Sequence, residues 1–542
     1  MENKLVIEVI NRGCYRLLCA LDRDSYSLTY GCFDRRYWGW KIVDFPEATY
    51  QRNALILAKM LSISVDTQRR RLLTTAIKSA LLYTAKIQHT DGSFDQAFPH
   101  EHSFGATAFL LDSLLESYLA IKTDFSQDEA TIIEKNFQKA ARFLCNHDET
   151  HGMIANHIAG AALALLRYGR YCKDESFCKA GQKFLSKVLD SQSDEGWYVE
   201  YEGADPGYQT LCVHYLAQYY RQEPNDKLKM SLEKSFEFLK WFVHPNGTFG
   251  GEYGSRRTSV FYPGGVALLA REFPVAAAIW NAMRDSLEKG LTVVPDRIDI
   301  GNLAPLLSSW FLALGNWTDE LVDIPELPCQ MELVSADFPN CGIYIRSWGD
   351  RYVICGVSNG GVIKIFDRKS GKTILNDCGY VGCLKNGIKI TTQLTGLKTK
   401  SIVTADCIEL ETPFFIMPAV VPSPFKFIIL RLLSLTIMRS IRLGNLVKLL
   451  LVKMMISGKK KIPLSLTRKL NCTFDGRIVI EDIIRSKRKI TLKWLRYGVP
   501  FCGIHMASAK YFEHFDTPEE KVVEVDVEQL NTNNEIHVKV EI

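Results

Sequence analysis

Several features are missing from this sequence of 542 residues, and each absence narrows the class of protein. No run of 18 apolar residues is free of charge, so no ordinary transmembrane helix is expected. The start, MENKLVIEVINRG, has acidic and polar residues where a secretion signal needs an apolar core, which predicts a cytoplasmic protein. The 15 cysteines include no C-x-x-C pair, which indicates packed, reduced thiols and no zinc ribbon or dithiol redox motif.

Charge and short motifs exclude further classes of function. The net charge of +5 is small for this length and does not indicate nucleic-acid binding. SGKT at 370–373 lacks the upstream glycine of a phosphate-binding loop, and no Gly-x-Ser-x-Gly elbow occurs. No cofactor is predicted. Hydrophobic residues at 47% and charged residues at 23% are typical of a globular protein, here of two or three domains.

What the sequence does contain is a repeat through its first 300 residues. Five segments share a polar or glycine-containing entry followed by a helix of small and aliphatic residues. Their entry residues lie 52 or 54 positions apart: Tyr50, His102, Asn156, Tyr208 and Tyr262. Amphipathic helices alternate with these apolar ones, and glycine turns join the two kinds. The period predicts five or six helical hairpins that close into an (α/α) toroid over 1–323, with the entry residues at one rim.

The pattern changes near residue 325. Segments such as 342–348, 351–358 and 362–367 alternate with period two between Gly, Asn and Asp turns. This alternation predicts an antiparallel β-sandwich domain over 329–542, joined to the toroid by a linker at 324–328. The fold class is therefore α+β with two domains.

A basic, aliphatic segment at 424–461 interrupts the β domain. Between 412 and 474 there are eleven basic residues and no acidic one. This pattern is typical of an amphipathic helix on an anionic membrane surface, with a break at Gly444 and Asn445. The alternative is a pair of ordinary helices packed on the toroid with their basic side in water. The residues predicted to face the membrane are Lys426, Arg431, Arg439, Arg442, Lys448 and Lys453.

Polar residues at the starts of the apolar helices are candidates for one site. Asn156 is either an N-cap or, together with His157, a group that holds a carboxylate at the helix start. Tyr208 follows Asp205 and Pro206 at the next helix start, and it is either a general base and acid or an aromatic lining residue. His214 lies over one turn further along and is more typical of a core group.

The next helix start adds paired cations. Each guanidinium of Arg256 and Arg257 can bind a carboxylate in bidentate fashion. The alternative is an ion pair with a nearby carboxylate: Glu200, Glu202 or Glu252. His100 and His102 form an H-x-H pair, but no third ligand is evident, so no metal site is predicted. The other candidates for substrate contact are His102, Gln51, Trp38, Trp197 and Glu202.

A helical toroid before a β-sandwich, with Asn-His opening one inner helix and Tyr the next, resembles the heparinase II/III and alginate lyase group of polysaccharide lyases. In that group, Asn and His neutralise a uronate carboxylate, and Tyr abstracts or relays a proton as the glycosidic oxygen leaves by β-elimination. The resemblance implies that Asn156 and His157 are the neutralisers and Tyr208 is the acid/base. It also implies that Arg256 or Arg257 contacts an acidic polysaccharide.

Two departures from that group bear on the reaction. Its members present a His-rich stretch from the first β-strands, whereas 354–367 contains no His, and His505 is a candidate substitute. They are also commonly exported. Both departures fit an enzyme of exopolysaccharide or cell-surface glycan metabolism at the inner membrane face.

Three other functions stay open beside the lyase. A uronyl epimerase shares its first step, removal of the proton next to the carboxylate. A non-catalytic glycan-binding or assembly protein needs no reaction at all. A terpenoid cyclase, suggested by QHTDGSF at 88–94, ranks lowest because no Asp-rich initiator motif is present.

Overall fold

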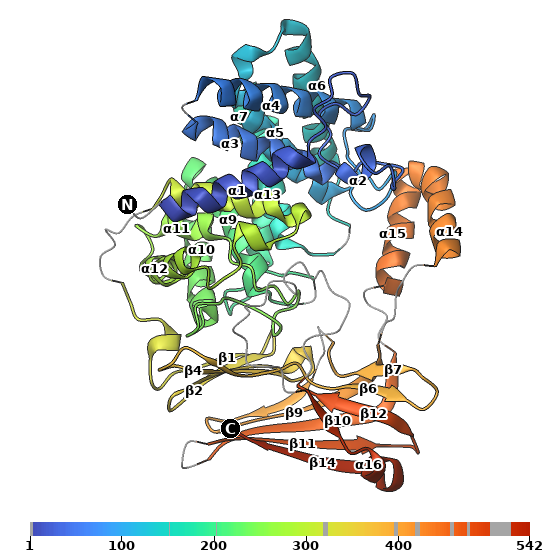
Figure 1. The fold of residues 1–542 in the computed structure, drawn as a ribbon. Helices are drawn as coiled ribbons and strands as arrows, with labels where there is room; N and C mark the ends of the chain where they lie inside the picture. The colour runs from blue at the N-terminus through green and yellow to red at the C-terminus, as the bar shows by residue number, and fades with distance from the viewer. Residues whose placement is uncertain are drawn as a thin grey trace.

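The computed structural model describes residues 4–64, 66–150, 152–201, 203–317, 324–394, 399–417, 423–455, 460–473, 477–498 and 522–542. A helical domain is followed by two β-sheets that lie beneath it in Figure 1. The last helix of the first domain ends at Leu314 and the first strand begins at Ser335, on either side of the predicted linker.

The helical domain is a closed ring of alternating inner and outer helices. The inner helices are α3 (Asn53–Ile63), α5 (Phe104–Ala120), α7 (Ala155–Cys172), α9 (Pro206–Gln222), α11 (Pro263–Leu269) and α13 (Ile300–Leu314). The outer helices are α1 (Lys4–Ala20), α4 (Thr67–Ile87), α6 (Gln127–Asn146), α8 (Glu175–Asp190), α10 (Asp226–Leu239) and α12 (Pro274–Lys289). Each inner helix contacts the next, and α13 contacts α3. The predicted (α/α) toroid is confirmed, with six helix pairs among the described residues.

Burial explains why the two kinds of helix differ in sequence. Along α9 every residue from Pro206 to Ala217 is buried, because inner neighbours and an outer helix cover all sides. The outer helix α8 buries one face only, formed by Phe177, Cys178, Gly181, Phe184, Leu185, Val188 and Leu189. A single apolar face, as on α8, is typical of a helix at the surface. A helix without a polar face, as α9, is typical of one enclosed on all sides.

One kind of glycine turn recurs where an outer helix is followed by an inner helix. Gly31, Gly92 and Gly196 have φ angles of 94°, 95° and 96°. A Cβ at these positions would lie 2.1, 2.2 and 2.3 Å from backbone oxygens of outer helices, those of Ser79, Lys139 and Lys234. Only glycine adopts this backbone conformation so close to another main chain. The turns therefore fix how each hairpin meets the next.

The second domain is an antiparallel sandwich. The first sheet has the order β1 (Ser335–Phe338), β2 (Ile343–Trp348), β3 (Arg351–Gly356), β4 (Val362–Asp367), β5 (Thr373–Asp377). The second runs β13 (Val523–Val525), β12 (Leu492–Tyr497), β6 (Val381–Leu384), β7 (Lys389–Thr391), β9 (Cys407–Ile416), β10 (Lys461–Cys472), β11 (Ile478–Ser486), β14 (Glu535–Glu541), with β8 (Lys400–Val403) paired to β9. Val353 and Ile365 of the first sheet pack with Leu410 and Ile480 of the second. The predicted β-sandwich is confirmed.

The sandwich docks on the turns that precede α11. The Asn359 side-chain amide donates hydrogen bonds of 2.9 and 2.8 Å to the backbone oxygens of Glu252 and Gly254. The Lys364 ammonium lies 3.1 Å from the Glu252 carboxylate. These contacts attach the first sheet to the segment that also carries Arg256 and Arg257.

The insertion between β9 and β10 is a helical hairpin of α14 (Pro424–Leu435) and α15 (Ile441–Met455). The first helix, α14, ends at Thr436, before a short 3-10 turn at Ile437–Arg439. The predicted break at Gly444 and Asn445 is therefore wrong. Gly444 instead lies within α15, where its Cβ position is 3.2 Å from the Met438 backbone oxygen, so glycine permits close packing of α15 on the turn.

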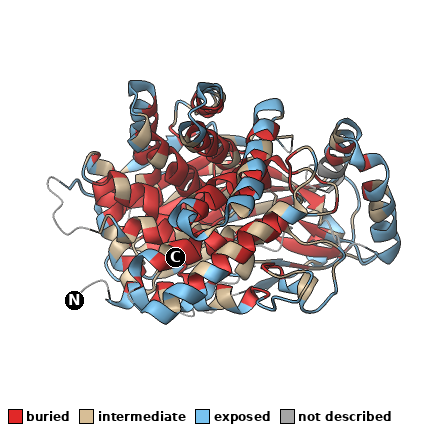
Figure 2. Cartoon of the chain, turned by 90° about the horizontal axis from the view of Figure 1, so that it is seen from above, coloured by how far each residue is buried: buried red, intermediate tan, exposed pale blue. Residues whose placement is uncertain are grey.

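The hairpin turns part of its basic side toward the toroid and much of its apolar side to solvent. Lys448 is 4% exposed, and Arg431 pairs with Asp44 at 2.7 Å, so the prediction that these two cations face outward is wrong. Lys426, Arg439 and Arg442 are exposed as predicted. The Lys453 side chain lies outside the described part of the chain. Figure 2 shows the exposed hairpin at one side of the molecule. No described helix is long and apolar enough to cross a membrane.

A buried ion cluster joins the two sheets. The Arg468 guanidinium contacts Asp482 at 2.7 Å and Asp377 at 2.8 Å, and it donates to the Gly361 backbone oxygen at 2.7 Å. The Tyr380 hydroxyl donates to Asp482 at 2.7 Å. All three charged side chains are almost fully buried.

Arg468→Met should destabilise the protein by about 3–5 kcal/mol, because it leaves two carboxylates buried without their cation. Chemical denaturation measures the change. The matched control is Arg485→Met, which removes an exposed partner of Glu535 in the next strand and should have little effect. Equal effects of the two substitutions would contradict a special role for the buried cluster.

Candidate active site

The starts of α7 and α9 and the segment before α11 meet at one rim of the toroid, where they bring together residues far apart in sequence. The Asn156 side-chain amide donates to both carboxylate oxygens of Glu200 at 2.9 Å. The Arg256 guanidinium donates to the same carboxylate. Two donors thus enclose one carboxylate in a buried place, with Glu200 and Arg256 each 3% exposed.

Tyr208 lies against this cluster. The Arg256 guanidinium carbon is 3.4 Å from the centre of the Tyr208 ring, a cation–π contact. Asp205 fixes both residues, since its carboxylate accepts the backbone N–H of Tyr208 and of Arg256, each at 2.9 Å. The predicted cap at Asp205, with Pro206 as the first helical residue, is confirmed.

Burial governs the proton affinities here. It raises the pKa of Tyr208, and the positive charge of Arg256 opposes that rise only in part. The raised pKa favours the neutral form of the phenol. Burial also raises the pKa of Asp205 to about 6, against the backbone N–H donors that favour its carboxylate form.

His157 forms a second polar pair beside the first. Its Nδ1 lies 2.7 Å from an oxygen of Glu149, whose side chain is 1% exposed, while the imidazole is 20% exposed. A hydrogen bond at Nδ1 fixes the tautomer and leaves Nε2 as the nitrogen for a ligand or proton. The backbone at Gly105 touches the ring, since a Cβ there would lie 2.5 Å from Nδ1. His157 is thus held on two sides.

The structure bears on the alternatives left open for Asn156 and for the two arginines. The N-cap of α7 is Ile154, so Asn156 is not a cap. Arg256 makes the ion pair with Glu200 that was one of the alternatives. Arg257 has a φ of 59°, and burial lowers its pKa to about 9, a change that the negative charge of Glu252 opposes in part.

Other predicted contact residues have structural partners. Gln51 is buried, its oxygen accepts the Phe33 N–H at 2.8 Å, and its amide donates to the Gly31 oxygen at 2.9 Å, so its role is to hold a turn. The prediction that it contacts substrate is not supported. Trp38 is half-buried. The indole N–H of Trp197 donates a hydrogen bond of 2.7 Å to the Glu195 carboxylate. Glu202 and His505 lie outside the described residues.

The sequence analysis did not place two of the charged groups at this rim. Glu149 stands in a polar loop with no helix to mark it, and only the fold places it beside His157. Lys448 comes from the hairpin of the β domain: burial lowers its pKa, and the carboxylates of Glu101, Glu149 and Asp95 oppose that change. His214 is buried, as the core interpretation predicted.

The toroid also contains a cavity of about 150 Å³. Its lining comes from the middle and the ends of inner helices, including Lys59, Glu116, Gln218 and Asn316. Arg167 pairs with Asp112 at 2.7 Å and with Glu116, so charges of both signs balance next to it. Arg52, which precedes α3, also lines this cavity, whereas Asn156, Glu200, Tyr208 and Arg256 of the rim cluster are not among its lining residues.

Comparisons with known proteins agree with this architecture. Residues 56–266 match the family model described as the ulvan lyase N-terminal domain. Among solved structures, a chondroitin AC lyase from Streptomyces coelicolor A3 matches with a TM-score of 0.55 and 10% identity, over 91% of this chain and 67% of that chain. The resemblance to polysaccharide lyases is confirmed.

Two further lyases match with lower TM-scores. A heparinase III has 13% identity and a TM-score of 0.45, over 92% of this chain and 72% of that chain. A heparan sulfate lyase from Pedobacter heparinus has 11% identity and a TM-score of 0.41, over 92% of this chain and 70% of that chain. No curated protein matches the chain. The similarity to the chondroitin AC lyase is one of fold, at 10% identity.

Gly105→Ala tests whether the position of His157 matters for turnover. Alanine favours the helix by about 1 kcal/mol, but its methyl group must displace the imidazole from Glu149. We expect a folded protein whose rate in a polysaccharide-lyase assay falls on the order of 10²-fold. Circular dichroism and initial rates measure the two effects. Gly315→Ala is the control, because its Cβ would meet nothing closer than 3.7 Å; equal rates in both variants would contradict the expectation.

Proposed function

We propose that this protein cleaves a uronate-containing polysaccharide by β-elimination at the toroid rim. The observation that carries the proposal is the carboxylate of Glu200, enclosed by the Asn156 amide and the Arg256 guanidinium next to a phenol. The same donors suit the carboxylate of a uronate. A substrate that shares or takes over these donors brings the carbon beside its carboxylate close to Tyr208 and His157.

Neutralisation of the uronate carboxylate is the first requirement of the reaction. The proton on the adjacent ring carbon becomes acidic only when the negative charge that develops on the carboxylate is stabilised. Asn156 and Arg256 supply an amide and a permanent cation for this purpose, in a place from which water is largely excluded. Glu200 keeps the two donors in position in the absence of substrate.

Proton transfer is the second requirement, and two groups divide it. The Nε2 atom of His157 takes the ring proton, and Glu149 at Nδ1 stabilises the imidazolium that forms. The electron pair of the broken C–H bond forms the carbon–carbon double bond, and the bond to the glycosidic oxygen breaks. Tyr208 donates its proton to that oxygen, a role that its raised pKa favours because the phenol starts neutral.

Tyr208→Phe should lower the rate of elimination by about 10²–10⁴-fold, since it removes the proton donor and keeps the ring under Arg256. The ultraviolet absorbance of the unsaturated product measures the rate on uronate polysaccharides. Tyr219→Phe is the matched control: it lies on the same helix, and its buried hydroxyl has no hydrogen-bond partner among the described residues. Wild-type activity in Tyr208→Phe would exclude this role.

The epimerase is distinguished in the same experiment. It removes the same proton but returns one to the ring carbon, so deuterium from solvent enters the sugar and no absorbance appears. Deuterium incorporation without absorbance would replace the lyase by an epimerase. Saturable binding with neither signal would leave a glycan-binding protein.

We further propose that the helical hairpin attaches the protein to an anionic membrane surface. Exposed large apolar residues occur along both helices and the turn between them: Phe425, Phe427, Ile428, Ile429, Leu432, Leu435, Ile437, Leu443, Leu446, Leu449 and Leu450. An apolar surface of this extent is unusual on a soluble monomer. Exposed Lys426, Arg439 and Arg442 lie among them, which suits acidic headgroups around an apolar contact.

Leu432→Ser with Leu446→Ser should weaken binding to vesicles of phosphatidylserine and phosphatidylcholine by roughly tenfold per residue, since each buried leucine contributes about 1.5 kcal/mol. Arg439→Gln with Arg442→Gln should reduce binding to the acidic vesicles and the sensitivity to salt. Cosedimentation measures both. Leu72→Ser, an exposed leucine of α4, is the control. Undiminished binding of the double leucine variant would contradict the proposal.

A further inference from the structure

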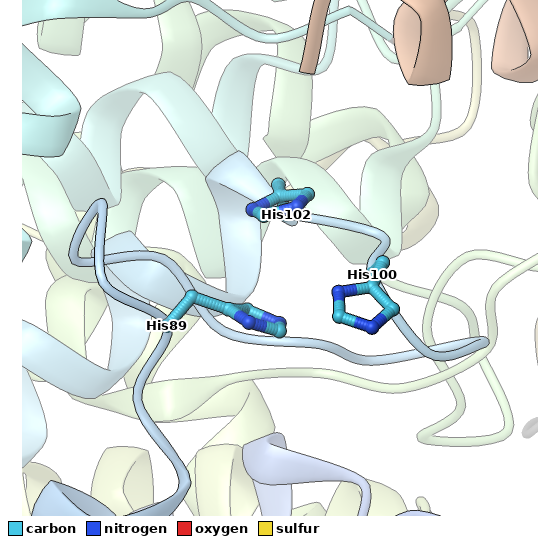
Figure 3. A group of neighbouring side chains, drawn as sticks. All are labelled: His89, His100 and His102. Carbon is cyan, nitrogen blue, oxygen red and sulfur yellow. The ribbon is translucent and has the colours of Figure 1, made fainter. Parts of the chain in front are cut away.

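The loop from α4 to α5 gathers three histidines that the sequence separates. His89 follows α4, and His100 and His102 precede α5 (Figure 3). One ligand nitrogen of each lies within 4.8 Å of those of the other two. The ring centres of His89 and His102 are 4.6 Å apart, and those of His89 and His100 are 5.2 Å apart. The H-x-H pair noted in the sequence thus acquires a third member.

Carboxylates hold two of the rings from behind. The Nε2 atom of His89 lies 2.9 Å from Asp95, and the Nδ1 atom of His102 lies 2.8 Å from Asp91. In metal sites, a ligating histidine usually gives its other nitrogen to a carboxylate, which orients the ring and makes it a better ligand. This arrangement assigns Nδ1 of His89 and Nε2 of His102 to a metal ion.

The environment of the His102 Nε2 atom also points to a ligand. The His102 side chain is 8% exposed, and its Nε2 is buried without a hydrogen-bond partner among the described residues. A buried polar nitrogen without a partner costs about 1–3 kcal/mol. Coordination of a cation removes that cost.

The backbone that presents the histidines is strained and firmly held. His100 and His102 have φ angles of 57° and 51°, in the left-handed region that residues with a Cβ rarely adopt. Asp95 imposes this turn, because its carboxylate accepts the N–H groups of His100, Glu101 and His102 at 2.8, 2.8 and 3.1 Å. One residue therefore orients His89 and also shapes the turn that carries the other two rings.

We propose that His89, His100 and His102 bind a zinc ion, with water as the fourth ligand. Three neutral imidazoles suit Zn²⁺, which prefers nitrogen ligands and tetrahedral geometry. Nitrogens at about 2.0–2.1 Å from zinc lie about 3.3 Å from one another, so modest rotations of the rings complete the site. The ion would link the end of α4 to the start of α5. Its ligand His102 lies three residues before Gly105, which contacts His157. The ion would therefore stabilise the rim without taking part in the reaction.

Metal binding is tested on the full-length protein, purified without a histidine tag, stripped with a chelator and then titrated with Zn²⁺ or Co²⁺. We expect stoichiometric binding, a visible Co²⁺ spectrum of tetrahedral type, and a higher melting temperature with Zn²⁺ than without it. His100→Gln should abolish the Co²⁺ spectrum and the zinc-dependent rise in melting temperature. Asp91→Asn should weaken zinc binding by about 10–100-fold.

His537→Gln is the matched control, because this exposed histidine pairs with a carboxylate, Glu535, far from the loop. It should bind the metal as the wild type does. Absence of stoichiometric binding by the wild type would overturn the proposal, and so would an unchanged Co²⁺ spectrum in His100→Gln. All of these readouts are independent of lyase activity.

Discussion

Closure of the inner ring is the constraint on which the rest of the structure depends. An inner helix such as α9 has no polar face, so it is stable only between two inner neighbours and an outer helix. The contact of α13 with α3 supplies the last of these neighbours and leaves no inner helix with a bare side. Because every inner helix then runs in the same direction, their starts meet at one rim, and a period in sequence becomes a cluster in space.

Charged side chains are buried at the rim, at the starts of otherwise apolar inner helices. Buried charges must be paired, and the carboxylate of Glu200 between Asn156 and Arg256 meets this need without a ligand. The pairing has a consequence for chemistry. Donors that stabilise a protein carboxylate are already oriented for another carboxylate, so the proposed binding of an acidic sugar needs little reorganisation. Asp205, which accepts N–H groups from two segments, keeps Tyr208 and Arg256 in register.

Periodic features of the sequence predicted the architecture, whereas the roles of individual side chains depend on contacts that no period records. The toroid, the sandwich and the meeting of Asn156, Tyr208 and Arg256 all result from helix period, strand period and repeat length. The structure gives Gln51 the role of holding a turn, which a polar residue at a helix start can fill without touching substrate. The helix break was misplaced because Gly444 permits close packing instead of ending the helix. Glu149 and His89 lie in loops, where no period marks a residue.

The hairpin connects the proposed membrane contact with the proposed reaction. Its apolar residues face outward, while Arg431 reaches Asp44 and buried Lys448 faces the carboxylates of the rim. Removal of Lys448 from water costs free energy that those carboxylates offset, so the orientation of α15 is coupled to the rim loops. In the proposed arrangement, a membrane at the outer face of the hairpin would contact the same helix that carries Lys448, whose charge interacts with Glu149, the partner of His157. The proposed attachment and the proposed chemistry therefore share one helix.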